Sequence, residues 1–243
     1  VYVMNQEITA HSRKAFESAV KMIGGLKNND GLFPQSSFLR IDQLLVNGQG
    51  NYIFDPMKQN GLGTVYDRKL DRNDGFLVIG MLLAFNVTNT GKPGAGVLAT
   101  SIPDVFKAME TYGTAGSVKD ISAVYNGKLT LKTGTSVTYD GFPTQVFKRE
   151  TVNLPAAGTA PAVIAAVDFS ESMYFTPEYL LLAGTKDQSF ELTFPSFAGA
   201  VYQDATESSK NQIYLSLYLQ GFLVKNGAVL YDMGGKANEF LFP

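Results

Sequence analysis

The chain has 243 residues, of which 45% are hydrophobic and 17% charged, and its formal net charge is −2. This apolar content is enough to offset the entropy of the ordered chain, which excludes intrinsic disorder as the main state. The near-neutral balance argues against binding to nucleic acid through counterion release, so we expect no sequence-specific nucleic-acid partner.

Residues that carry chemistry are scarce. The chain contains no cysteine, no tryptophan and a single histidine, His11. A disulfide framework, a thiol nucleophile and a cysteine zinc site are therefore excluded. One histidine also argues against multi-histidine metal sites and most Ser-His-Asp hydrolases. We expect no metal and no organic cofactor, and we expect that the protein is not an enzyme.

The first predicted element is an amphipathic helix over residues 8 to 23. Ile8, Phe16, Val20 and Ile23 recur at helical spacing, and the glycines at 24 and 25 supply a stop. The apolar stripe either packs on its own domain or docks on a neighbouring subunit. The second interpretation makes these four residues candidate assembly contacts, and residues 1 to 30 an N-terminal helical arm.

From residue 36 the hydrophobic period changes toward two, which is typical of strands. The expected strands are residues 38–46, 51–54, 75–87, 128–132, 136–139, 144–148, 179–183, 189–194, 213–224 and 229–231. Two of them, 75–87 and 213–224, are almost continuously apolar, which predicts burial on both faces. Gly80 in the middle of the first indicates a bulge or a close backbone approach. Residues 103 to 112 are expected to form a short helix.

About ten strands with one confident helix predict a mainly β protein. The expected architecture is a jelly-roll or β-sandwich barrel, preceded by the N-terminal amphipathic helix. Residues 31 to 243 would form the β-rich body. A compact double jelly roll is the alternative, with two sub-barrels and a break near residues 113 to 127. No segment reaches 18 uninterrupted apolar residues, so no transmembrane helix is predicted.

Motifs with a possible chemical role are few. The segment from Asp71 to Gly75 resembles part of a calcium loop, but glycine falls one position early and no glutamate closes the loop. Glu171, Glu178 and Glu191 could supply the carboxylate pair of a glycosidase. We favour a solvated turn for the first and surface charges for the second. Residues 86 to 88 form a glycosylation sequon at the end of an apolar strand.

Four segments carry a resemblance to a known group of proteins, together with the amphipathic N-terminal helix. They are FPQSSFLR at 33–40, DRKLDRNDGF at 67–76, LTFP at 192–195 and GFLVKNG at 221–227. In this layout the chain resembles the jelly-roll capsid proteins of tailless bacteriophages and other viruses. The resemblance is one of architecture over most of the chain, and it transfers no site residue.

The resemblance implies a self-assembling subunit of a virion shell. Its partners would be copies of itself and other virion proteins, in a homo-oligomer located in the virion. The high phenylalanine and tyrosine content and low charge are typical of protein–protein contact surfaces. Two alternatives stay open: an extracellular or cell-surface carbohydrate-binding module, and a β-rich hydrolase that uses carboxylates.

Overall fold

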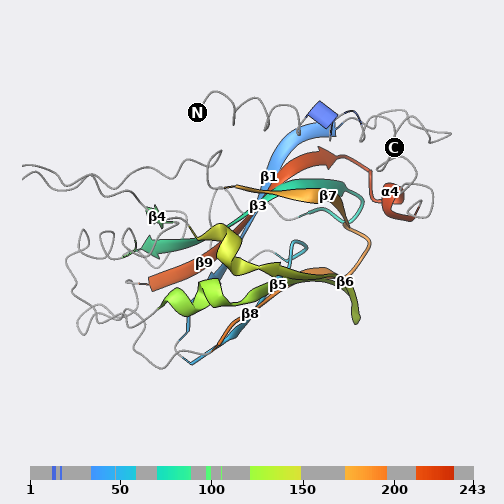
Figure 1. Ribbon diagram of the computed structural model, residues 1–243. Coiled ribbons are helices and arrows are strands. Elements are labelled where there is room, and N and C mark those ends of the chain that lie inside the picture. The colour runs from blue at the N-terminus through green and yellow to red at the C-terminus, as the bar shows by residue number, and fades with distance from the viewer. Residues whose placement is uncertain are drawn as a thin grey trace, which may run out of the picture.

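The described part of the chain is a mainly β structure in which two antiparallel sheets lie as layers (Figure 1). The computed structural model describes residues 13, 14, 17, 34–46, 48–58, 70–88, 97–99, 105, 121–148, 173–195 and 212–232. This sandwich-like arrangement confirms the expected fold class. The division into an arm of residues 1 to 30 and a body of residues 31 to 243 stays a prediction.

The first sheet, sheet A, has five described strands. They are β1 (Pro34–Leu44), β3 (Gly75–Thr88), β4 (Val97–Ala99), β7 (Tyr174–Ala183) and β9 (Gln212–Val224). β9 lies between β1 and β3, and the far side of β3 pairs with β7 along one half and with β4 along the other. The two long apolar strands predicted from the sequence therefore lie side by side at the centre of this sheet.

The second sheet, sheet B, has four described strands. They are β2 (Asn51–Phe54), β5 (Lys128–Thr133), β6 (Ser136–Pro143) and β8 (Gln188–Thr193). Their order is β2-β8-β5-β6, so β2 and β6 are the two edges. Strands from before and after residues 113 to 127 pair with one another in both sheets.

The pairings are nested along the chain. β1 pairs with β9, β2 with β8, β3 with β7 and β5 with β6. Thus the first strand pairs with the last and each following strand pairs one step inward, with only β4 outside the series. A single long antiparallel hairpin, folded across two layers, gives this order.

The core fills the space between the sheets because alternate residues of each strand point inward. Phe76, Phe85 and Leu217 from sheet A and Phe54 and Phe190 from sheet B belong to one buried cluster. All 14 positions of β3 are buried, so this central strand of sheet A is covered on both of its faces. Sheet B is different, since β2 alternates between exposed and buried residues. Its outer face is partly open to solvent, since Ile53 of β2 is 55% exposed whereas Thr130 of β5 is 6% exposed.

A bulge interrupts β3 where the sequence predicts one. The register of β3 against both β7 and β9 shifts between Val78 and Gly80. A Cβ atom at Gly80 would lie 2.7 Å from Cγ of Met173. The lack of a side chain therefore lets Met173 pack directly over the bulge, as the glycine in this apolar strand indicated.

Residues 144 to 148 were expected to form a strand, and this prediction is wrong. β6 runs on to Pro143, and the chain then forms a 3-10 helix, η3 (Thr144–Phe147). The Thr144 hydroxyl donates to Val124 O at 2.7 Å and accepts from Gly127 N at 2.9 Å. These bonds fold the segment back onto another 3-10 helix, η2 (Ile121–Asn126), which the sequence did not predict.

Residues 229 to 231 were expected to form the second strand of a hairpin, and they form the short helix α4 (Val229–Asp232) instead. Asn226 adopts a left-handed conformation with φ of 55°. The turn then docks on the start of β3, where Ala228 N donates to Asn73 O at 2.9 Å. This bond holds the chain beside the start of β3, so the chain does not turn back to pair with β9.

Candidate functional site

The candidate assembly contacts Ile8, Phe16, Val20 and Ile23 lie outside the described residues. Three neighbours on the predicted polar face of the same helix are described. Arg13, Lys14 and Glu17 are helical and exposed. Arg13 Nε lies 3.1 Å from Glu17 Oε1, one helical turn further on. These three residues are helical and exposed, while the apolar stripe and its contacts stay a prediction.

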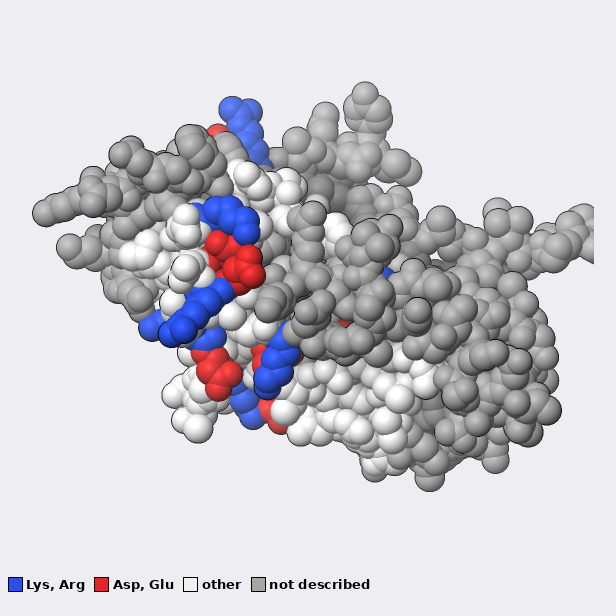
Figure 2. Space-filling view, turned by 180° about the vertical axis from the view of Figure 1, so that it is seen from behind, with Lys and Arg blue, Asp and Glu red and all other residues white. Residues whose placement is uncertain are grey.

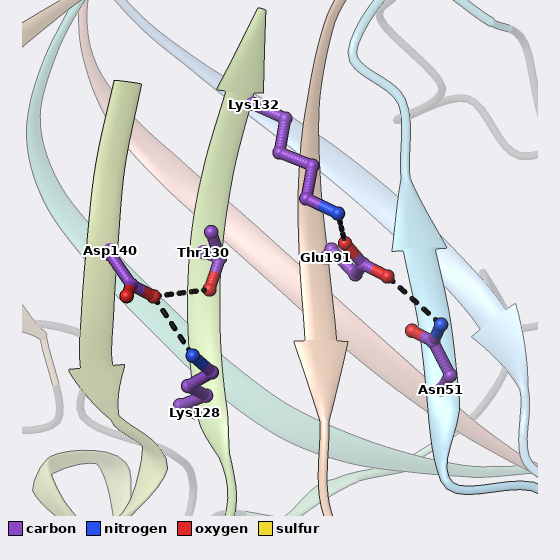
Figure 3. Close-up of polar contacts among 6 residues, drawn as sticks. All are labelled: Asn51, Lys128, Thr130, Lys132, Asp140 and Glu191. Atoms are coloured by element: carbon purple, nitrogen blue, oxygen red, sulfur yellow. Dashed lines mark hydrogen bonds and ion pairs between the residues drawn. The ribbon is translucent and has the colours of Figure 1, made fainter. Parts of the chain in front are cut away.

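The open face of sheet B carries polar side chains that cross from strand to strand (Figure 3). Asn51 Nδ2 on β2 donates to Glu191 Oε1 on β8 at 2.9 Å, and the other oxygen of Glu191 pairs with Lys132 on β5. These contacts link three strands. Cross-strand pairs of opposite charge are a usual way of stabilising an open sheet face.

A second set of contacts continues to the β6 edge. Lys128 Nζ lies 3.0 Å from Asp140 Oδ1, and the Thr130 hydroxyl donates to the same oxygen at 3.3 Å. Figure 3 shows that both groups point toward Asp140 from the neighbouring strand. Together the two sets span all four strands, so we name them the sheet B ladder: Asn51, Lys128, Thr130, Lys132, Asp140 and Glu191.

The ladder carboxylates are held in their charged form. Hydrogen bonds from Lys132 and Asn51 lower the pKa of Glu191. The hydrogen bond from Lys128 lowers the pKa of Asp140. A glycosidase needs the opposite for its general acid, a carboxyl group whose pKa is raised.

The ladder therefore gives no support to the hydrolase hypothesis. Glu171 lies outside the described residues, and only the backbone of Glu178 is described. Among the three glutamates considered for catalysis, the described side chain is that of Glu191, which is occupied by Lys132 and Asn51.

A buried polar cluster lies on the outer face of sheet A. Arg40 and Asp42 are two residues apart on β1, and Arg40 Nε donates to Asp42 Oδ1 at 3.0 Å. The Ser216 hydroxyl of β9 donates to the same carboxylate, and the Arg40 guanidinium lies 5.3 Å from the centre of the Tyr218 ring. Arg40 and Asp42 are only 6% and 2% exposed.

We interpret this cluster as a structural feature and not as a catalytic site. The charges of Arg40 and Asp42 are paired, and a buried pair becomes costly when one partner is removed. Burial raises the pKa of Tyr214, and the charge of Asp42 raises it further. Our sequence analysis missed the cluster, although a signal existed. Arg40 and Asp42 alternate with apolar Leu39 and Ile41, which places both charges on one face of the strand.

The Asp71–Gly75 segment is a structural turn. Asp74 accepts hydrogen bonds from Lys225 Nζ at 2.6 Å and from Asn226 N at 3.0 Å. These donors hold the turn after β9 against the start of β3. A calcium site needs such oxygens as ligands, whereas here protein donors use them. The described residues contain no group of three metal-ligating side chains.

The described surface offers no aromatic platform. Figure 2 shows described basic and acidic side chains alternating in a band on one side of the molecule. Among the described large hydrophobic side chains that are exposed, Phe38 is the one aromatic. A carbohydrate-binding module would use several exposed rings to stack on sugars.

Comparisons with known proteins give no relationship for this chain: no family model, no curated protein and no solved structure matches it. Within the described residues, no helix has the length and apolarity required to cross a lipid bilayer.

Proposed function

We propose that the chain is a structural, self-assembling subunit of a virion shell, with copies of itself and other virion proteins as partners. The observation that carries the proposal is the nested order of the strands. In sheet A the order is β1-β9-β3, with β4 and β7 both on the far side of β3, and in sheet B it is β2-β8-β5-β6. With β4 set aside, this order supports the proposal because it is compatible with the two Greek keys of an eight-stranded jelly roll. Viral capsid domains are one of the groups built in this way.

The side chains support a structural role over catalysis. Jelly rolls also occur in lectins and in enzymes, so the fold alone does not select a function. The ladder carboxylates are neutralised by lysines, and Asp74 is engaged in closing a turn. The described surface therefore favours contact with other proteins, and localisation in the virion follows from that proposal.

The direct test is whether the purified full chain forms particles. Light scattering after size-exclusion chromatography and electron microscopy would measure mass and shape. We expect closed particles of uniform size. A monomer at all concentrations would contradict the proposal and favour the carbohydrate-binding module, which glycan-array binding would then examine.

A pair of variants links assembly to the candidate contacts. Phe16→Asp places a charge in the predicted apolar stripe and is expected to reduce particle yield strongly. Lys14→Asp is the matched control, because Lys14 is helical and exposed. We expect it to assemble like the unmodified chain. Equal particle yields from the two variants would argue against a role for the stripe.

A further inference from the structure

The free edge of β2 has an unusual arrangement of hydrogen bonds. In the described part of the chain, β2 is a terminal strand of sheet B and its inner neighbour is β8. Phe194 N donates to Gly50 O at 2.8 Å, which makes Gly50 and Phe194 a hydrogen-bonded pair. Because such pairs alternate along an antiparallel ladder, Asn51 and Ile53 direct their backbone groups away from β8.

Two glutamine side chains donate hydrogen bonds to the backbone carbonyl groups of this edge. Gln43 Nε2 donates to Ile53 O at 2.8 Å, and Gln49 Nε2 donates to Asn51 O at 2.7 Å. Both outward carbonyls of the strand thus have a donor. Gln43 belongs to β1, so its amide also bridges from sheet A to sheet B.

The end of β1 beside this edge is closed in a similar way. The hydroxyl of Tyr52 accepts from Val46 N at 2.9 Å and donates to Val46 O at 3.2 Å. Leu45 N donates to Ile213 O at 2.9 Å, so the groups of Val46 point away from β9. Side chains therefore satisfy edge groups on both strands at this corner of the sandwich.

The opposite edge of sheet B is guarded by other means. β6 pairs with β5 through a register that shifts twice, and Gly141 has φ of 97°. Charged Asp140 and Pro143 also lie on β6. Bulges, charges and proline are known ways of keeping an edge strand from pairing with another chain. β2 has none of these, and Ile53 is 55% exposed on it.

We infer that Gln43 and Gln49 keep the free edge of β2 closed against strand addition by a second copy of this chain. An incoming strand must donate its N–H groups to the carbonyls of Asn51 and Ile53. While the glutamine amides hold these acceptors, the added strand must displace them, and the N–H groups of Asn51 and Ile53 alone give it about half of the ladder. The inference is independent of the proposed shell function, since it concerns an association that the native edge prevents.

The test is the double variant Gln43→Ala, Gln49→Ala in the full chain. Both side chains can be shortened without opening a cavity in the core, because Gln49 is exposed and Gln43 lies at the surface between the sheets. Sedimentation velocity over a concentration series would measure the mass distribution. We expect the variant to form species larger than those of the wild type, at about tenfold lower concentration, which corresponds to about 1.4 kcal/mol.

Two controls define the result. Gln35→Ala removes an exposed glutamine of the same strand, β1, and should leave the mass distribution unchanged. Adding Ile53→Lys to the double variant places a charge on the open edge and should reverse the association. The inference is wrong if the double variant keeps the wild-type distribution, or if Ile53→Lys does not reverse the change. It is also wrong if circular dichroism shows the double variant unfolded, because the amides would then support the fold.

Discussion

Asn86 has a side-chain amide that is buried near the end of β3. It is 1% exposed, and among the described residues neither its nitrogen nor its oxygen has a hydrogen-bond partner. Its neighbours across the sheet are Tyr214 on β9 and Leu98 on β4. This burial also makes the Asn86 sequon inaccessible in the folded protein.

We predict that Asn86→Leu stabilises the protein by about 1–2 kcal/mol, because it removes an unsatisfied buried amide and keeps the branched shape of the side chain. Urea unfolding monitored by circular dichroism would measure the change. Asn51→Leu is the control, since Asn51 is exposed and bonded to Glu191, and it should gain nothing. A less stable Asn86→Leu variant would show that the amide has a role that the fold needs.

Glu191 gives a prediction about pH. Its folded pKa is lowered from the ordinary value of 4.5 by the hydrogen bonds from Lys132 and Asn51. A lowered folded pKa contributes stability above the ordinary value, and this contribution disappears as the pH falls through the folded value. We expect the wild type to exceed Glu191→Gln by no more than about 1 kcal/mol at pH 7.

The difference should vanish in acid. Unfolding of both proteins at a series of pH values from 7 to about 3 would measure it. Asp140→Asn is the comparison, because Asp140 is also paired with a lysine but has a side chain that is 62% exposed. Its effect should be smaller. A Glu191→Gln difference that stays constant through the whole range would contradict the role of the carboxylate charge.

At the scale of elements, β3 and β9 are the centre of the protein. Leu217 on β9 is fully buried between the sheets, and Ile79 on β3 is 2% exposed. Leu217→Asp and Ile79→Asp would bury an unpaired charge, so we predict a loss of several kcal/mol for each. Ile53→Asp is the matched control, because the same change falls on a side chain that is 55% exposed. A wild-type melting temperature in either buried variant would refute the prediction.

The central strands could be predicted from the sequence because a strand that is buried on both faces is a continuous run of apolar residues. This run can be recognised without knowing what the strand packs against. The expected ranges 75–87 and 213–224 differ from β3 and β9 by one residue each. The bulge could be predicted too, because Gly80 is a glycine inside an apolar strand. At these positions a run of consecutive apolar residues is enough to predict a strand.

The errors have a different origin, since they depend on contacts between distant segments. Nothing near Thr144 in the sequence shows that its hydroxyl bonds to Val124 O, which turns an alternating segment into η3. The turn at Asn226 is likewise fixed by Asp74, about 150 residues earlier. The ladder on sheet B was out of reach for this reason too, because it needs the register of four strands.

At the scale of the whole molecule, the two sheets differ in what they present. Sheet A has a central strand, β3, that is buried on both faces, and it contains the paired charges Arg40 and Asp42. Sheet B carries the ladder on its outer face. The amides of Gln43 and Gln49 bond to carbonyl groups of its β2 edge, and the pairing of its β6 edge shifts in register. In such a molecule, we expect copies to meet through side chains rather than by continuing a sheet from one subunit to the next.

The last prediction concerns the N-terminal arm. The described core between the sheets begins at Leu39, so removing residues 1 to 27 takes away none of its described members. Arg13, Lys14 and Glu17 are exposed, and Arg13 pairs within the arm itself.

We therefore predict that the shortened chain keeps the circular dichroism spectrum and melting transition of the β body, while light scattering shows impaired assembly. The reason is that the apolar stripe predicted at Ile8, Phe16, Val20 and Ile23 would lose its contact with a neighbouring subunit. A shortened chain that assembles like the full one would refute the role of the arm, and one that fails to fold would show that the helix packs on its own sandwich.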